Sequence, residues 1–264
     1  MRVTFSFLAI PLGLVVGVTL GTLGGGGSIL TVPALVYLIG ENPQHATTAS
    51  LVIVGVTAIT GTAGHARAGR VRWGAGLVFG IVGAAGSLLG SVLNRLVDPD
   101  VLLLGFAGLM ALTAAAMLQR SWRHGPAKSH PFRGSEGSLT TRRVLEVVSA
   151  GTVVGFMTGF FGVGGGFVVV PAMVLALDFA MPEAVGTGLL VIALNSVTAL
   201  AARGGIVAVD WGVVAPFAVS AMVGSLLGYR VAARIPAKQL ARIFAVLLVL
   251  LAIYVASRSV VGLA

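Results

Sequence analysis

The chain has 264 residues, of which 57% are hydrophobic and only 9% are charged. A soluble domain carries about 25% charged residues, so a soluble fold of this composition could not cover its surface. The mean hydropathy of +1.03 and the net charge of +9 predict an all-α membrane protein, whose basic residues orient it in lipid rather than bind nucleic acid.

Ten apolar runs follow one another along the chain. Runs of about 19–21 residues are long enough to span a bilayer as helices. The two shortest runs each directly follow a cluster of glycines, which distinguishes them from the runs that are long enough to span the bilayer. The runs lie at residues 5–23, 28–39, 46–64, 74–94, 101–119, 144–162, 166–180, 184–202, 212–232 and 239–257.

One polar stretch divides the chain into two halves. Residues 120–143 contain six basic residues together with prolines and glycines. This composition is typical of a cytoplasmic linker between membrane segments. We therefore predict a first transmembrane repeat over residues 1–119, a cytoplasmic linker over 120–143 and a second transmembrane repeat over 144–264.

The two halves repeat each other at a shift of 138 positions. The string Gly-Ser-Leu-Leu-Gly occurs at 86–90 and again at 224–228, and Trp73 matches Trp211. One small indel moves the match to 139 positions at Thr48 and Thr187. Matching over such a length indicates a duplication rather than chance. The glycines and proline at positions 17, 21, 24, 26, 27 and 33 recur at 155, 159, 162, 164, 165 and 171.

Charge indicates that the two copies are inverted in the membrane. The loop 65–72 carries three arginines, whereas its partner near 203–210 has one arginine and one aspartate. The loop 95–100 has one arginine against two aspartates, whereas its partner near 230–242 has four basic residues. Opposite charge bias in matched loops is expected of inverted repeats, because positive loops stay in the cytoplasm. Two parallel halves of four spans each remain the alternative.

Each half contains one glycine cluster that leads to a proline, Gly21 to Pro33 and Gly159 to Pro171. Clustered glycines hold a helix poorly, and a helix break in lipid survives only where it lines a cavity or binds something. A helix restarting at Ser28, with Ser28 as its N-cap, would point amide N–H groups and a positive dipole end into that cavity. The pattern predicts a glycine-broken or re-entrant element in each half, with a tight turn between packed helices as the alternative. The predicted anion-binding residues here are Gly24, Gly25, Gly26, Gly27, Ser28, Gly162, Gly164, Gly165 and Gly166.

A few polar residues complete the predicted substrate site. Thr47 and Thr48 open one apolar run and Thr187 opens its partner, where their hydroxyls either contact substrate or bond a neighbouring helix. Asn195 lies in the middle of a run, and an amide is costly to bury unused.

His65 and Arg203 occupy equivalent positions at the ends of two matched runs. Arginine is always charged and histidine is charged when protonated, so either residue can be the cationic partner of an anion. The alternative is that both are charges at the membrane interface that reach back to water.

The sequence offers no catalytic, metal or cofactor site. The absence of cysteine excludes disulfides and thiolate chemistry. The other histidines lack the spacing of metal ligands, and no Ser–His–Asp arrangement is placed in one membrane leaflet. The acidic residues lie near helix ends or in loops, so a buried carboxylate proton relay is not visible. We therefore predict no catalytic residue, no metal and no cofactor.

The paired motifs resemble those of the sulfite exporter TauE/SafE family. The residues that carry the resemblance are Gly24 to Pro33 with Ala46 to Ser50, Gly162 to Pro171 with Gly186 to Gly188, and the pattern His65…Gly69…Trp73. The resemblance covers nearly the whole chain and implies a permease that moves sulfite or sulfonates such as sulfoacetate. The second half departs from the first in lacking a histidine at the position of His65.

Residues and resemblance together predict a secondary transporter for small sulfur-containing or organic anions, working by alternating access in the inner (plasma) membrane. Its expected partners are the small anionic substrate and the lipid bilayer, without nucleic acid; whether it forms a homo-oligomer is left open. An anion channel and an intramembrane enzyme are the rival functions, although no nucleophile or pair of acids stands out for an enzyme. A non-transporting membrane subunit is a weaker rival, because a scaffold has no need of two helix breaks.

Overall fold

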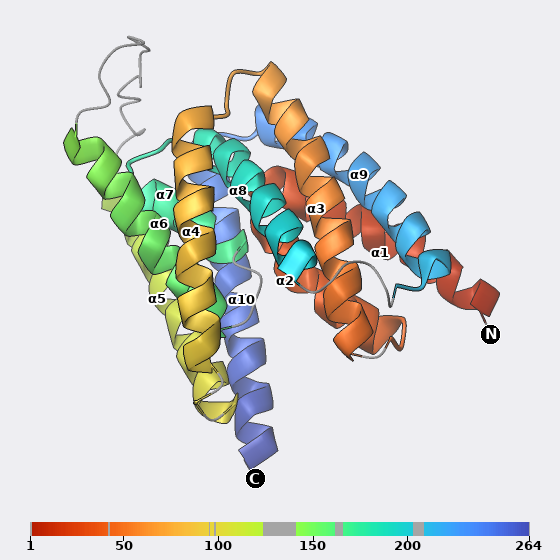
Figure 1. Ribbon diagram of the computed structural model, residues 1–264. Helices are drawn as coiled ribbons and strands as arrows, with labels where there is room; N and C mark the ends of the chain where they lie inside the picture. Colours follow the sequence, from red (N-terminus) through yellow and green to blue (C-terminus); the bar gives the residue numbers. More distant parts are fainter. Residues whose placement is uncertain are drawn as a thin grey trace.

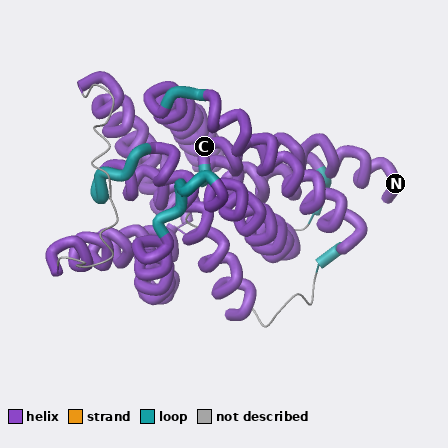
Figure 2. Tube along the Cα trace, turned by 90° about the horizontal axis from the view of Figure 1, so that it is seen from above, coloured by secondary structure: helices purple, strands orange, loops and turns teal. Residues whose placement is uncertain are grey.

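The computed structural model is helical throughout the regions that it describes, with short connections between the helices (Figure 1, Figure 2). It describes residues 2–41, 43–94, 96–97, 99–123, 141–161, 166–202 and 209–263. In the first half the elements are α1 (Arg2–Leu23), α2 (Gly26–Pro33), the π-helix η1 (Ala34–Leu38), α3 (Pro43–Arg67), α4 (Trp73–Asn94) and α5 (Pro99–Arg123). In the second half they are α6 (Thr141–Phe161), α7 (Gly166–Leu175), α8 (Met181–Ala202), α9 (Trp211–Arg234) and α10 (Ala237–Leu263).

Five helices in the described regions are long and apolar enough to cross a membrane: His45–Arg67, Trp73–Gly90, Met181–Ala201, Trp211–Arg234 and Ala237–Val255. The outer surface of the bundle is apolar as well, with Ile81, Leu89 and Leu112 each 68% exposed. A surface of this kind suits lipid rather than water. The prediction of an all-α, multi-pass membrane protein is confirmed.

Several element boundaries differ from the sequence prediction: the run 28–39 is divided between α2 and η1, and the last helix continues to Leu263. The run 166–180 is helical only as far as Leu175, and the chain then turns through Asp178, whose φ is +55°. Aspartate is one of the few non-glycine residues that tolerates this left-handed conformation. Both ends of the predicted linker 120–143 are helical, because α5 continues to Arg123 and α6 begins at Thr141. Residues 124–140 lie outside the described regions.

Glycines line the contacts of two helix pairs, α1 with α9 and α4 with α6, and each pair joins one half of the chain to the other. We call these two contacts the glycine seams. A Cβ on Gly17 of α1 would overlap the backbone of Ala221 in α9, and a Cβ on Gly155 of α6 would overlap the backbone of Gly83 in α4. These two contacts are equivalent under the 138-residue shift. Small residues allow such close approach between membrane helices. The same seams are lined by the Gly-Ser-Leu-Leu-Gly strings, so those strings are packing motifs.

The centre of the bundle is an antiparallel pair formed by the equivalent helices α3 and α8. Gly55 faces Ser196, and Gly61 faces Leu189. Figure 1 shows the same opposite directions, with α3 ending and α8 beginning at the upper end of the bundle. Thr57 of α3 and Asn195 of α8, which match each other at the 138-residue shift, lie within the stretch over which the two helices face each other.

Candidate functional site

The first glycine cluster is a true helix break. Helix α1 ends at Leu23, and Gly24 follows with φ of +77°, a conformation that glycine adopts without strain. The N–H of Gly24 donates to the carbonyl of Leu20 at 2.7 Å, which satisfies one free carbonyl at the end of α1. Helix α2 then starts at Gly26, with Gly25 as its N-cap. The predicted glycine-broken element is confirmed in the first half.

The start of α7 lies against this break. A Cβ on Gly25 would overlap the carbonyl oxygen of Gly166 and would lie 2.8 Å from the Cα of Phe167. A Cβ on Gly166 would in turn overlap the Oγ of Ser28. Two short helices from different halves thus begin beside each other, and each carries a partial positive charge at its N-terminus. Gly162, Gly164 and Gly165 precede α7 but lie outside the described residues.

The predicted role of Ser28 as an N-cap is wrong. Gly25 occupies that position without any side-chain cap, and the half-buried Ser28 hydroxyl donates to the Gly25 carbonyl at 2.8 Å. The glycine cluster allows the chain to turn and restart a helix three residues earlier than a serine cap requires. Ser28 therefore steadies the first turn of α2 and faces α7. Gly27 is buried against α1, where a Cβ would lie 2.7 Å from the Cβ of Leu20.

The predicted polar residues occupy three different places on α3 and α8. Thr47 and Thr48 are half-buried near the start of α3. Thr187 is fully buried near the start of α8, where its hydroxyl accepts the backbone N–H of Arg72 at 3.0 Å. Asn195 lies in the stretch of α8 that faces α3, and its Oδ1 is buried without a hydrogen-bond partner. A buried amide oxygen accepts hydrogen bonds, so a water or a donor group would satisfy it and an anion would not.

His65 is buried completely, so the alternative of an interfacial charge reaching water is excluded for it. Its Nε2 lies 3.1 Å from the carbonyl oxygen of Gly21, one turn before the helix break. Its ring packs edge-on against Tyr229, with 5.1 Å between ring centroids. His65 of α3 therefore contacts both the end of α1 and α9. It lies beside the last turn of α1 and not among the glycines of the break. Its repeat partner Arg203 lies outside the described residues.

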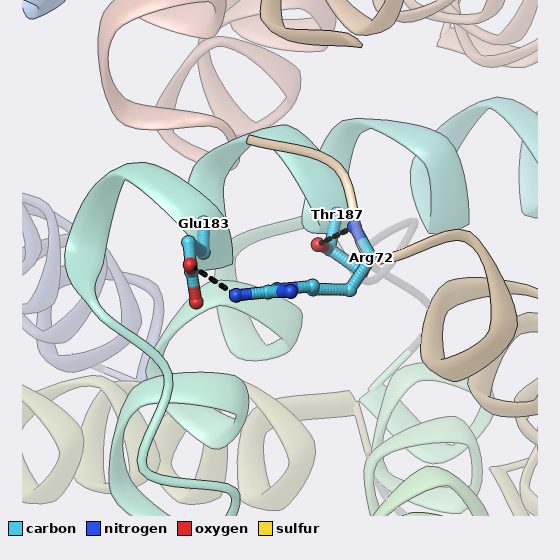
Figure 3. Close-up of polar contacts among 3 residues, drawn as sticks. All are labelled: Arg72, Glu183 and Thr187. Carbon is cyan, nitrogen blue, oxygen red and sulfur yellow. Dashed lines mark hydrogen bonds and ion pairs between the residues drawn. The ribbon is translucent and has the colours of Figure 1, made fainter. Parts of the chain in front are cut away.

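A contact between the halves was not predicted from the sequence. Arg72, in the loop between α3 and α4, forms an ion pair of 2.6 Å with Glu183 in the first turn of α8 (Figure 3). The same arginine donates its backbone N–H to Thr187, so loop and helix are held at two points. Both charged side chains are about a quarter exposed, at 26% and 27%. We call this contact the latch. In the sequence, the feature that could have indicated this contact is Glu183, the single acidic residue in the first turn of α8.

We expect that removing the latch weakens the packing between the two halves while each half stays folded. Glu183→Gln and Arg72→Gln should each lower stability by about 1 kcal/mol, because a partly buried ion pair is worth only slightly more than a surface pair. Thermal unfolding of the single and double variants in detergent measures this coupling. If the two single effects simply add in the double variant, the ion pair contributes no coupling of its own.

Comparison with known proteins matches the chain over almost its full length. The sulfite exporter TauE/SafE family profile matches residues 9–255. The chain belongs to the sulfite exporter TauE/SafE family. A "Probable membrane transporter protein" of Xylella fastidiosa is 35% identical over 264 residues, covering 98% of each chain. The "Probable membrane transporter protein YunE" of Bacillus subtilis is 27% identical over 258 residues, covering 92% of this chain and 94% of its own. No solved structure matches significantly.

The family membership and the architecture support a membrane transporter rather than an enzyme. Within the described regions no group of three or more His, Cys, Asp or Glu residues could hold a metal ion. No aspartate or glutamate is buried there either.

Proposed function

We propose that this protein is a secondary transporter for small sulfur-containing or organic anions, sulfite and sulfonates such as sulfoacetate, working by alternating access. The observation that carries the proposal is the meeting of two helix starts, α2 at Gly25 and α7 at Gly166, inside a membrane bundle. Membership in the sulfite exporter family supports the substrate class. The relatives' description as probable membrane transporters supports the activity.

The helix starts can offset the charge of an anion. Each contributes about half a positive unit from its unpaired N–H groups, so the pair together approaches the charge of a monoanion. Asn195, in the stretch of α8 that faces α3, adds a side-chain NH2 group as a donor that needs no protonation; its Oδ1 only accepts hydrogen bonds and does not pair with an anion. An anion in a low-dielectric region requires such compensation, since an unpaired buried charge is costly.

The contact between Gly25 and Gly166 suggests which parts move. Their backbones are too close for any side chain between them, so an anion bound at both helix starts would require the two to separate. Each short helix packs on the long helix that follows it, α2 on α3 and α7 on α8. Movement of α2 with α3 relative to α7 with α8 would separate the helix starts and expose them to alternate sides, as in other repeat-built transporters, while the close packing of α1 on α9 and of α4 on α6 is kept.

The antiparallel packing of α3 and α8 supports inverted repeats, and a topology experiment tests them. The arginines of the α3–α4 loop, the end of α5 and the end of α9 gather at one end of the bundle, which we assign to the cytoplasm. Reporter fusions should then place the linker 124–140 inside and the C-terminus at Ala264 outside. A C-terminus on the same side as the linker would favour parallel halves and overturn the inversion.

Transport itself is tested by uptake into proteoliposomes containing the purified protein. Labelled sulfite, sulfate, sulfoacetate and taurine should be offered under imposed pH and voltage gradients. We expect saturable uptake of sulfite or a sulfonate and little uptake of zwitterionic taurine, because the helix starts match net negative charge.

Counterflow separates a transporter from a channel in the same vesicles. Unlabelled substrate inside should accelerate entry of labelled substrate through a carrier that alternates between two sides. Flux that rises linearly with concentration and shows no counterflow would replace the transporter by an anion channel.

A further inference from the structure

A basic groove lies on the lipid-facing side of the bundle, between the C-terminal ends of α3 and α9. It has a volume of about 190 Å³ and is lined by Gly64 and Arg67 of α3 and by Leu226, Tyr229 and Arg230 of α9. The two helices run parallel here, because Gly61 meets Ser225 and Gly64 meets Tyr229. The groove therefore lies where both helices approach their C-terminal ends, at the edge of the membrane-spanning region.

Three guanidinium groups surround this groove without a matching acid. Arg67 and Arg230 line it and are exposed, while the guanidinium carbon of Arg70 lies 5.9 Å from the centre of the Tyr229 ring. The ion pairs found in the described regions involve other arginines, Arg72 and Arg120. Neither α3 nor α9 contains an aspartate or glutamate. This positive charge lacks a described counter-ion within the protein.

The buried side of the groove also contains unsatisfied polar groups. The Nη1 atom of Arg70 and the Nδ1 atom of His65 are both buried without a hydrogen-bond partner. His65 is fully buried and packs directly on Tyr229, one wall of the groove. Both atoms lie beneath the Tyr229 wall and outside the groove lining, so a ligand in the groove would meet the Tyr229 ring and the two lining arginines rather than these atoms.

Apolar side chains extend from the groove toward the middle of the membrane. On α9, Leu226, Val223 and Val219 are 40%, 49% and 60% exposed, and they descend in successive turns from Arg230. On α3, Ile59 is 54% exposed two turns before Arg67. The exposed face of α9 is thus an apolar stripe that ends at Arg230, and α3 adds the exposed Ile59 below Arg67. A soluble anion would gain nothing from this apolar surface, whereas the acyl chains of a phospholipid would pack along it.

We propose that the groove is a binding site for an anionic phospholipid, with its phosphate held by Arg67 and Arg230 and its acyl chains along α3 and α9. Basic pockets between membrane helices at the interface are suited to acidic head groups. Gly64 lets the Tyr229 ring pack directly on the backbone of α3, because a Cβ there would lie only 3.3 Å from the Cγ of Tyr229. The lipid would bridge α3 of one half and α9 of the other.

Native mass spectrometry of the full-length protein in detergent, titrated with phosphatidylglycerol or phosphatidylcholine, tests the proposal. Arg67→Gln/Arg230→Gln should weaken phosphatidylglycerol binding about 25-fold, from roughly a factor of five for each arginine at a membrane surface. Phosphatidylcholine binding should not change. The matched control, Arg234→Gln/Lys238→Gln, removes the same charge from exposed positions that do not line the groove and should retain phosphatidylglycerol binding.

The outcomes separate lipid from other ligands. Equal phosphatidylglycerol binding by both double variants and the unaltered protein would overturn the site. Displacement of the lipid by millimolar inorganic phosphate or glycerol phosphate would replace it with a soluble-anion site. Thermal unfolding of each variant confirms that the exposed substitutions leave the fold intact. Because lipid binding is measured without transport, failure here is distinct from failure of the proposed transport function.

Discussion

Gly25→Ala should reduce anion transport by one to two orders of magnitude while the protein stays folded in the membrane. The backbone of Gly25, with φ of −114° and ψ of −25°, is accessible to alanine, so the change introduces no conformational strain. The added methyl would overlap the carbonyl oxygen of Gly166 and so disfavour the state in which α2 and α7 are in contact, a state that the alternating cycle needs. Overpacking of this kind costs about 1–3 kcal/mol, which shifts an equilibrium about 5- to 150-fold.

A matched substitution controls for general effects of an added methyl. Gly108 lies in α5 with no heavy atom within 4 Å of a new Cβ, so Gly108→Ala should transport normally. Both variants are compared for uptake in proteoliposomes and for monodispersity in size-exclusion chromatography. Normal uptake by Gly25→Ala would remove the substrate site from the contact between α2 and α7.

Gly17→Ala and Gly155→Ala should each lower the stability of the bundle strongly, and the two losses should be similar. Their methyl groups would overlap the backbones of Ala221 and Gly83 on the facing helices, and backbone cannot turn aside as a side chain can. We expect each variant to lose about 1–3 kcal/mol or more of the free energy of unfolding. Similar losses are expected because the two sites are equivalent positions of the repeat.

Thermal unfolding in detergent, followed by circular dichroism, measures these losses. Gly108→Ala again serves as the reference and should be neutral or slightly stabilising, because alanine favours a helix by roughly 1 kcal/mol over glycine. An unchanged midpoint for Gly155→Ala would contradict the close backbone packing of α4 on α6. A loss in only one of the two variants would show that the seams are not energetically equivalent.

The helical architecture and the first break are predictable from sequence because each rests on a local property. The number of apolar runs and their lengths define the helices, and the four consecutive glycines Gly24 to Gly27 define the first break. The contacts of α1 with α9 and of α6 with α4 could not be predicted, because a shift of 138 residues does not say which helices touch. Once the structure is known, the repeat explains why the two contacts are alike. The start of α2 differs from the prediction because glycine itself serves as the N-cap where the sequence rule expects serine.

The polar contacts are less predictable because they depend on tertiary packing. His65 ends an apolar run like any interfacial charge, and only the placement of Tyr229 and Gly21 around it shows that it is buried. The latch requires knowing that the loop containing Arg72 lies over the first turn of α8. In the sequence, the arginines of the lipid-facing groove indicate only orientation, and their shared groove emerges only when α3 and α9 are packed side by side.

Cysteine protection at Ser28 tests the central claim, that the helix starts of α2 and α7 form the anion site. The chain contains no cysteine, so Ser28→Cys places a single thiol beside Gly166, and Ser149→Cys places one on an exposed turn of α6 as the control. Alkylation by iodoacetamide is followed with and without the sulfonate that the uptake assay identifies as transported. We expect saturable protection of the thiol in the Ser28→Cys variant over the concentration range that saturates transport, with the control unaffected. Alkylation of that thiol that stays unchanged at saturating sulfonate would contradict the claim.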